Sequence, residues 1–193
     1  MQNLSLLLDL DIEYYENFLS TAKADSLFLT FRQTLKWTQG YIQLFGLKAE
    51  PRLSCWYGDI GAIYTYSQKK MSPLPWTREL YIVKCEIEEK TGYTFNSALC
   101  NLYRNGNDSM GWHSDDEPEL GKNPVIASLS LGATRKIVYK HKLNKKLKHE
   151  LELKNGSLLI MKGSCQHEWL HQIPKQPKII IPRINITFRK VYF

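Results

Sequence analysis

The feature that most constrains the fold is a change in hydrophobic period at Ser97. Beyond it, apolar and polar side chains alternate in short runs, the period-two pattern of strands with one buried face. We expect strands at 97–103, 125–132, 135–142, 149–154, 157–161, 167–172 and 183–191. Short strands that follow one another without intervening helices favour a closed antiparallel sandwich or jelly roll over a parallel βαβ sheet.

The part before Ser97 also predicts two helices. Residues 21–35 have apolar side chains at helical spacing, with Ser20 or Thr21 as the N-cap. Residues 77–90 show the same period. A chain of 193 residues fits one compact domain, so we expect a single α+β domain, mainly β with flanking helices.

The segment between the two helices is rich in aromatic residues. A turn at residues 38–40 predicts a hairpin with Phe45 at its far end. Phe45 either packs against its own hairpin or is an apolar wedge for a base stack. Tyr64 and Tyr66 share one face of an extended segment, where they either join the core or stack on a base.

The charge of the chain is compatible with a polyanionic partner. Its net charge is +7 and its pI is near 9.1, values that fit either a nucleic-acid partner or a merely basic surface. The distribution favours a partner, because five lysines lie within nine positions: Lys140, Lys142, Lys145, Lys146 and Lys148.

Other features bear on the compartment. No apolar run reaches the ~18 residues that a membrane span needs, and the first residues lack the basic start of a secretory signal. The four cysteines include no CxxC pair, which favours reduced thiols over a zinc site or a disulfide framework. We therefore expect a cytoplasmic protein, or a nuclear one if the source is eukaryotic, without membrane contact and monomeric.

One short motif suggests a metal. If Ser114 is extended, His113 and Asp115 point to the same side of the chain. With a second histidine they would form the two-histidine, one-carboxylate triad of non-haem Fe(II) oxygenases. An HxD triplet alone is weak, because short triplets recur by chance.

The third ligand must come from the remaining four histidines. His141 and His149 flank the lysines and are better interpreted as solvated or facing phosphates. His167 and His171 fall on one face of the same predicted strand, so spacing alone does not separate them.

The last predicted strand carries a polar stripe. Arg183, Asn185, Thr187 and Arg189 share one face, opposite apolar residues. A surface strand could have this pattern, but two fixed guanidiniums could also hold the two carboxylates of a small diacid. Six strand residues span about 20 Å, so the two arginines would have to lean toward each other.

At this point the sequence resembles the AlkB-type Fe(II)- and 2-oxoglutarate-dependent nucleic-acid dealkylases, and most closely the subgroup that acts on duplex or single-stranded DNA and on RNA. The resemblance covers roughly residues 51–193. The residues that carry it are Asn101-x-Tyr103, His113-Ser114-Asp115, IASLSLGATR at 126–135, NGSLLIM at 155–161, Trp169-x-His171 and Arg183-x-Asn185-x-Thr187-x-Arg189.

The resemblance implies a double-stranded β-helix core at residues 97–193, a nucleotide-recognition lid and helix at 51–96, and an N-terminal helix and hairpin at 1–50. It also implies the site residues. Iron would be held by His113, Asp115 and His171. The cosubstrate would be held by Asn101, Tyr103, Arg183, Asn185, Thr187 and Arg189. The base would lie against Tyr64, Tyr66, His113 and Glu117, with Phe45 as the wedge.

The implied reaction uses dioxygen and 2-oxoglutarate to remove N-alkyl groups from bases such as 1-methyladenine and 3-methylcytosine, releasing formaldehyde, succinate and CO2. The implied role is repair of alkylated DNA, with RNA as a further substrate. Backbone phosphates would be bound by Arg52, Lys140, Lys142, Lys145 and Lys146. Two alternatives remain: an oxygenase that acts on a protein or lipid, and a nucleic-acid-binding module without catalysis.

Overall fold

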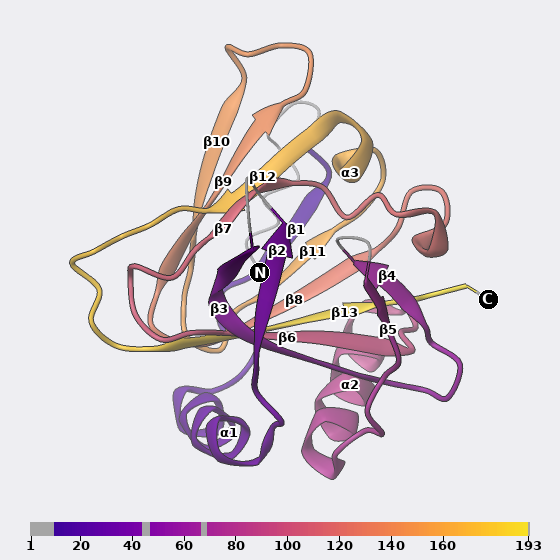
Figure 1. Ribbon diagram of the computed structural model, residues 1–193, viewed down its shortest axis with the longest axis vertical. Coiled ribbons are helices and arrows are strands. Elements are labelled where there is room, and N and C mark those ends of the chain that lie inside the picture. Colours follow the sequence, from indigo (N-terminus) through magenta and orange to yellow (C-terminus); the bar gives the residue numbers. More distant parts are fainter. Residues whose placement is uncertain (1–9, 44–46, 67–68, 193) are drawn as a thin grey trace.

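The computed structural model describes residues 10–43, 47–66 and 69–192 (Figure 1). Its helical segments are α1 (Thr21–Thr34), α2 (Arg78–Thr91), the 3-10 turn η1 (Pro118–Leu120) and α3 (Cys165–Glu168). Its strands are β1 (Ile12–Tyr15), β2 (Thr38–Gln43), β3 (Leu47–Gly58), β4 (Tyr64–Tyr66), β5 (Lys69–Met71), β6 (Ser97–Tyr103), β7 (Met110–His113), β8 (Ile126–Gly132), β9 (Arg135–His141), β10 (Lys148–Leu153), β11 (Leu158–Met161), β12 (Trp169–Ile173) and β13 (Arg183–Arg189).

Two antiparallel sheets form the core. The larger has the order β1-β11-β8-β13-β6-β3-β2, and the smaller has the order β10-β9-β12-β7. Buried side chains from both sheets, such as Tyr103 and Tyr139, belong to one apolar cluster, so the sheets pack face to face. A separate ribbon, β4-β5, stands outside the two sheets (Figure 1). The expected class, mainly β with flanking helices around a jelly roll, is confirmed.

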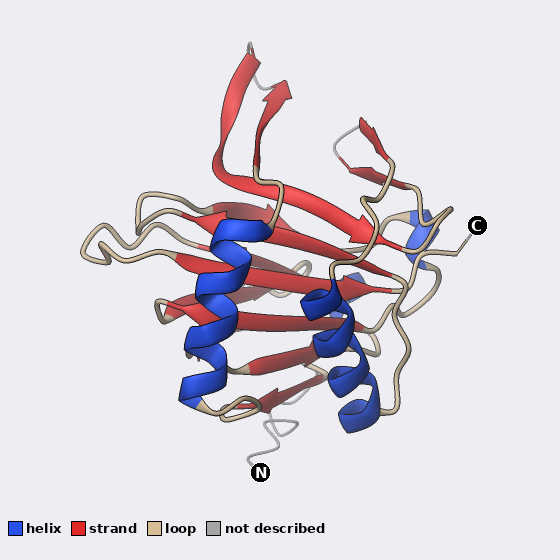
Figure 2. Cartoon of the chain, turned by 90° about the horizontal axis from the view of Figure 1, so that it is seen from below, coloured by secondary structure: helices blue, strands red, loops and turns tan. Residues whose placement is uncertain are grey.

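Both long helices cover the outer face of the larger sheet (Figure 2). Phe31 of α1 and Val83 of α2 are fully buried there, together with apolar residues of β6 and β13. The helices begin where the sequence predicts. Ser20 accepts a hydrogen bond from the backbone N–H of Lys23, and Thr77 accepts one from the N–H of Leu80.

Strand β13 lies in the middle of the larger sheet, between β6 and β8. All seven of its residues are buried, so the surface-strand interpretation of its polar stripe is wrong. Ile184, Ile186 and Phe188 point to the helix-covered side. The four polar residues therefore point to the space between the sheets.

The N-terminal half is more closely joined to the core than the sequence indicates. β1 pairs with β11 at one edge of the larger sheet, and β2 and β3 extend the other edge. β3 runs across the expected boundary at residue 50. The predicted turn at 38–40 lies instead within β2, which pairs with β3. Gly40 suggested a turn, but in the structure it lies at a register shift between these two strands.

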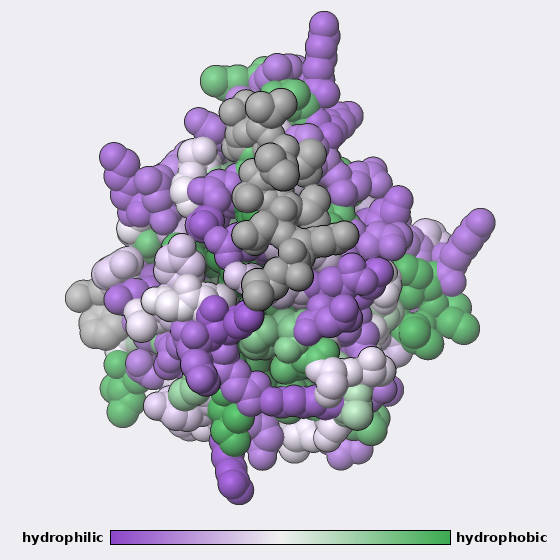
Figure 3. Space-filling model, turned by 180° about the vertical axis from the view of Figure 1, so that it is seen from behind, coloured by the Kyte–Doolittle hydropathy of each residue, from purple (hydrophilic) through white to green (hydrophobic). Residues whose placement is uncertain are grey.

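The remaining general features are simple. In the described part of the chain, no helix is long and apolar enough to cross a membrane. All four cysteines are free thiols, as expected. Seen from behind, hydrophilic side chains cover most of the described surface, and apolar side chains lie in small separate groups (Figure 3).

Candidate active site

All nine residues expected to bind iron or the cosubstrate line one cavity between the two sheets. They are Asn101, Tyr103, His113, Asp115, His171, Arg183, Asn185, Thr187 and Arg189. The larger sheet supplies those on β6 and β13, and the smaller sheet supplies the two histidines. Arg183 and Arg189, at opposite ends of one strand, thus reach the same cavity.

The two histidines are neighbours across a strand pair. His113 ends β7 and pairs with His171 on β12, and their ring centroids lie 4.2 Å apart. His113 Nδ1 lies 2.9 Å from the carbonyl oxygen of Gly111. If Nδ1 carries the proton and donates it there, the Nε2 lone pair is directed to a ligand, the arrangement common to metal-bound histidines.

The structure separates His171 from His167. His171 is 5% exposed, and its Nδ1 is buried without a hydrogen-bond partner among the described residues. Burial lowers the pKa of His171 to about 3 and also lowers the pKa of His113, so both rings are neutral, as metal binding requires. His167 is exposed and lies in α3, where a strand was expected, and its Nε2 accepts a hydrogen bond from the backbone N–H of Asn123.

Asp115 is buried and held from two sides. Its carboxylate Oδ1 accepts a hydrogen bond of 2.9 Å from Arg189 Nη2, and its backbone N–H donates to Gln166 Oε1, also at 2.9 Å. Burial would raise the pKa of Asp115, but the positive charge of Arg189, which also donates a hydrogen bond to it, holds the pKa below its usual value. Asp115 is therefore a carboxylate, the form that binds a metal.

Gln166 is a site residue that the sequence analysis missed. It is fully buried, and besides its bond to Asp115 its backbone carbonyl accepts a hydrogen bond of 2.9 Å from Lys142 Nζ. The same ammonium donates to Asp116 Oδ2 at 3.1 Å. Lys142 thus ties the segment of Asp115 to α3, and its expected contact with a phosphate stays a prediction.

The three candidate iron ligands share the cavity without forming a finished site. Among the described residues, no group of three or more His, Cys, Asp or Glu side chains is arranged so that it could hold a metal ion as it stands. The cavity measures about 40 Å³, room for only a few water-sized groups. The donor types, two imidazoles and a carboxylate, fit Fe(II).

Arg183 is the strongest sign of an anionic ligand. It is 1% exposed, and its Nη2 donates a hydrogen bond of 2.9 Å to Ser130 Oγ. Its Nε and Nη1 are buried without partners among the described residues. The Tyr103 ring lies 5.3 Å from this guanidinium. A buried cation with two unused donors fits the far carboxylate of a diacid.

The structure corrects the expected role of Arg52 in binding a backbone phosphate. Arg52 is 4% exposed, and it forms an ion pair with Glu50 and donates to Asn101 Oδ1 at 2.9 Å. It therefore supports Asn101 from inside the protein and cannot reach a backbone phosphate. With its oxygen engaged, Asn101 offers a ligand its NH2 group. This support has no signal in sequence spacing, because 49 positions separate the two residues.

Asn185 lines the cavity but has partners within the protein. Its Nδ2 donates to Ser128 Oγ and to the carbonyl oxygen of Leu129, and its Oδ1 accepts from Thr187 Oγ1 at 3.2 Å. The expected contact with the cosubstrate stays a prediction. Asn185 joins β13 to β8 and positions Thr187.

The basic cluster is divided by its surroundings. Lys145 and Lys146 are exposed in the turn between β9 and β10, whereas Lys140 Nζ lies over the exposed Trp112 ring, 4.2 Å from its centroid. The two histidines beside the cluster are not solvated as expected. His141 and His149 both pack against the buried Trp169 ring.

The expected base-binding residues are placed only in part. Tyr64 and Tyr66 lie on β4, but their side chains lie outside the described part of the structure, as does the whole of Phe45. Glu117 is half-buried and immediately precedes η1, two residues after Asp115.

Comparison with known proteins agrees with this geometry. The family model described as "2OG-Fe(II) oxygenase superfamily" matches residues 11–189, so the likeness extends further toward the N-terminus than the motifs indicated. A solved structure, OsALKBH1, has a TM-score of 0.65 at 19% identity and covers 93% of this chain and 97% of its own. That likeness concerns the fold alone.

Two human proteins are much closer in sequence. The alpha-ketoglutarate-dependent dioxygenase alkB homolog 3 of Homo sapiens is 44% identical over 92% of this chain. The DNA oxidative demethylase ALKBH2 of Homo sapiens is 37% identical over 94% of this chain and 74% of its own length. The chain spans 65% of the human alkB homolog 3. It therefore belongs to the 2OG-Fe(II) oxygenase superfamily, and within it to the AlkB type, which implies Fe(II), 2-oxoglutarate and dioxygen as its cofactors.

Proposed function

We propose that this chain removes N-alkyl groups from nucleobases, such as 1-methyladenine and 3-methylcytosine, in DNA and in RNA. The products are the restored base, formaldehyde, succinate and CO2, and the role is repair of alkylation damage. The observation that carries the proposal is the single cavity that gathers two histidines, a buried carboxylate and a buried arginine with unused donors. The name of the relative that is 37% identical, a DNA oxidative demethylase, supports the choice of substrate.

The residues divide the work. His113, Asp115 and His171 hold the iron, which together with 2-oxoglutarate supplies the oxidising chemistry when both are bound. Arg183 binds the far carboxylate of 2-oxoglutarate. Arg189 lies beside Asp115 and neutralises the negative charge that gathers at that end of the cavity.

The other cavity residues orient the cosubstrate. Tyr103 lies against Arg183 and limits where the guanidinium can move. Asn101 donates from its NH2 group, and Thr187 supplies a hydroxyl held by Asn185. Because both walls are sheet strands, these donors are held in place before the ligand arrives.

To reach the cavity, the substrate base must flip out of its nucleic-acid duplex. A methyl group on N1 of adenine or N3 of cytosine blocks base pairing, which lowers the cost of flipping that base out. Tyr64, Tyr66 and His113 hold the base, Glu117 faces its positive charge, and Phe45 fills the gap that the base leaves. Lys140, Lys145 and Lys146 bind the backbone phosphates.

We further propose a monomer that acts away from membranes, in the cytoplasm or in a nucleus. The free thiols support a reducing compartment. On the face shown in Figure 3, the apolar side chains lie in small separate groups, which is compatible with a monomer.

A formaldehyde-release assay tests the function. Matched methylated substrates, as single-stranded DNA, duplex DNA and RNA, are incubated with the chain, Fe(II) and 2-oxoglutarate. Release from at least one of them is expected, and the His113→Ala variant, folded and otherwise identical, should release none. Formaldehyde from a methylated protein but from no nucleic acid would replace this proposal with a protein substrate. Absence of any 2-oxoglutarate turnover would favour a binding module.

A further inference from the structure

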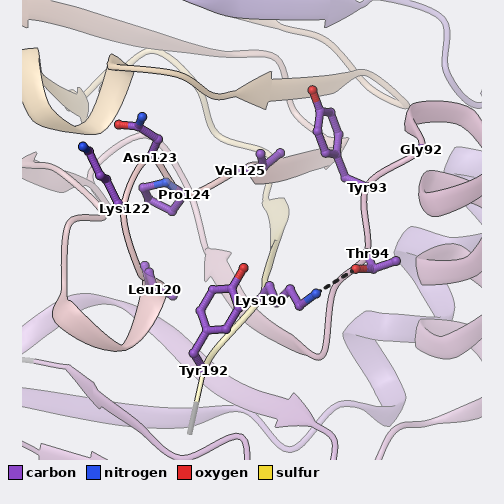
Figure 4. Close-up of a pocket in the computed structure, with 10 residues that line it drawn as sticks. All are labelled: Gly92, Tyr93, Thr94, Leu120, Lys122, Asn123, Pro124, Val125, Lys190 and Tyr192. Carbon is purple, nitrogen blue, oxygen red and sulfur yellow. Dashed lines mark hydrogen bonds between the residues drawn. The ribbon is translucent and has the colours of Figure 1, made fainter.

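A second cavity lies apart from the one that holds the candidate iron ligands. It is about 240 Å³ in volume, and ten residues line it (Figure 4). They come from the end of α2, the segment after η1 and the end of the chain beyond β13. None of them lines the active-site cavity.

The lining carries positive charge without any acid. Lys122 and Lys190 are both exposed, and the other eight lining residues include neither Asp nor Glu. Lys190 Nζ donates to Thr94 Oγ1 at 3.3 Å, so its ammonium is held within the cavity rather than spread into solvent (Figure 4). Lys122 and Lys190 lie on different sides of the cavity in Figure 4 and point away from each other, so each suits a separate phosphate of a nucleic-acid backbone.

The same cavity offers surfaces for a flat ring. Tyr192 is 59% exposed, and Lys190 Nζ lies 5.6 Å from its ring centroid. Leu120 and Pro124 are buried and form apolar lining, and Tyr93 stands at the opposite side in Figure 4. An aromatic face beside cations is the combination that binds a base together with its phosphate.

The position of the cavity relates it to the active site. Lys190 follows Arg189 directly, so neighbouring residues of one chain segment line the two cavities. Leu120 lies five residues after Asp115. The η1 turn, the C-terminal end and the β4-β5 ribbon lie at the same end of the molecule in Figures 1 and 2.

We propose that this cavity is a second nucleotide-binding site, in which Lys122 and Lys190 bind phosphates of the strand and Tyr192 stacks on a base between them. Its occupant is a nucleotide of the substrate strand, on one side of the base that is oxidised. This inference rests on the proposed function, since it takes the substrate to be a nucleic-acid strand.

Binding measurements test the site without any turnover. Fluorescence anisotropy gives the affinity of the chain for a labelled, methylated single strand at several salt concentrations. The Lys122→Ala/Lys190→Ala variant should bind more weakly, and the slope of log K against log salt should fall by about one for each lost phosphate contact. Tyr192→Leu, which keeps the charge, should weaken binding by about tenfold.

A matched control uses two other exposed lysines. Lys175 and Lys178 lie in the loop between β12 and β13, at the opposite end of the molecule (Figure 1). The Lys175→Ala/Lys178→Ala variant has the same net charge as the test variant. It should bind nearly as the native chain does. If both variants lose the same affinity for the strand, the effect is one of net charge alone, and the proposed binding site is wrong.

Shortened strands and a free nucleotide identify the occupant. The deficit of the test variant should vanish for a strand that ends at the methylated base on one side, and adenosine monophosphate should compete with the longer strand. If adenosine monophosphate or inorganic phosphate occupies the cavity without competing, the strand is not the occupant and the proposal fails. If the native chain binds strands but releases no formaldehyde, the proposed function fails while the binding result stands.

Discussion

Replacing Arg183 by methionine should make the ligand-free chain more stable while removing its cosubstrate site. Burial lowers the pKa of Arg183 from its usual value to about 10, which corresponds to about 3 kcal/mol against the charged folded form. Losing the hydrogen bond to Ser130 offsets about 1 kcal/mol of that gain. We therefore expect Arg183→Met to raise the free energy of unfolding by about 2 kcal/mol.

The sign of the effect follows from the charge states at neutral pH. Both the folded and the unfolded chain carry the charged guanidinium at pH 7, so the cost is fully present there. It is relieved only as the pH rises above about 10, where the folded chain begins to lose the proton.

Urea unfolding measures the difference, first without ligands and then with Fe(II) and 2-oxoglutarate under nitrogen. 2-Oxoglutarate at a hundred times its dissociation constant should stabilise the native chain by about 2.7 kcal/mol. It should leave Arg183→Met unchanged. Fe(II) alone should stabilise the two proteins equally, because Arg183 is not an iron ligand.

Arg135 provides the matched control. It is as buried as Arg183 and also lies beside Tyr103, at 5.5 Å from the ring. Its guanidinium, however, donates to the carbonyl oxygens of Asn105, Asp108 and Pro174. Arg135→Met leaves these acceptors unpaired and should cost about 3 kcal/mol or more. If Arg183→Met lowers the free energy of unfolding as Arg135→Met does, the argument that the buried Arg183 guanidinium destabilises the ligand-free chain is refuted.

Three further predictions concern the site and the surface. His113→Ala should abolish formaldehyde release without unfolding the chain, and retained turnover would exclude His113 as a ligand. Gln166→Leu should weaken Fe(II) binding by about tenfold to a hundredfold, because it frees the backbone of Asp115; an unchanged affinity in a metal titration would reduce Gln166 to packing. Lys145→Ala with Lys146→Ala should weaken binding to all sequences alike and flatten its salt dependence, and an unchanged salt slope would remove the turn from the binding surface.

The sequence predicted the strands after Ser97 well because their alternation is local. β6 was predicted at its observed bounds, and β13 within two residues. Two elements were missed. β7 (Met110–His113), which carries His113, was not predicted as a strand, and α3 is a short helix that replaces the start of a predicted strand. The four residues of α3 are too few to show a helical period, so spacing could not separate His167 from His171.

Long-range contacts explain the remaining errors. A polar stripe looks the same on a surface strand and on β13, and only the helices that cover the other face make it buried. Arg52 looks like a free cation until Glu50 and Asn101 are brought against it. Lys142 belongs to a dense run of lysines, yet Asp116 and α3 engage it. None of these partners can be read from local spacing.

Strand β13 makes catalysis and folding difficult to alter independently. Each β13 residue that faces the iron cavity is adjacent in sequence to a residue whose side chain is buried beneath the two helices. A change at Ile186, made only to adjust packing, would tilt the backbone that carries Thr187 and Asn185. Engineering of cosubstrate preference should therefore combine each change on β6 or β13 with a compensating change beneath the helices, because the cosubstrate residues lie on these two strands.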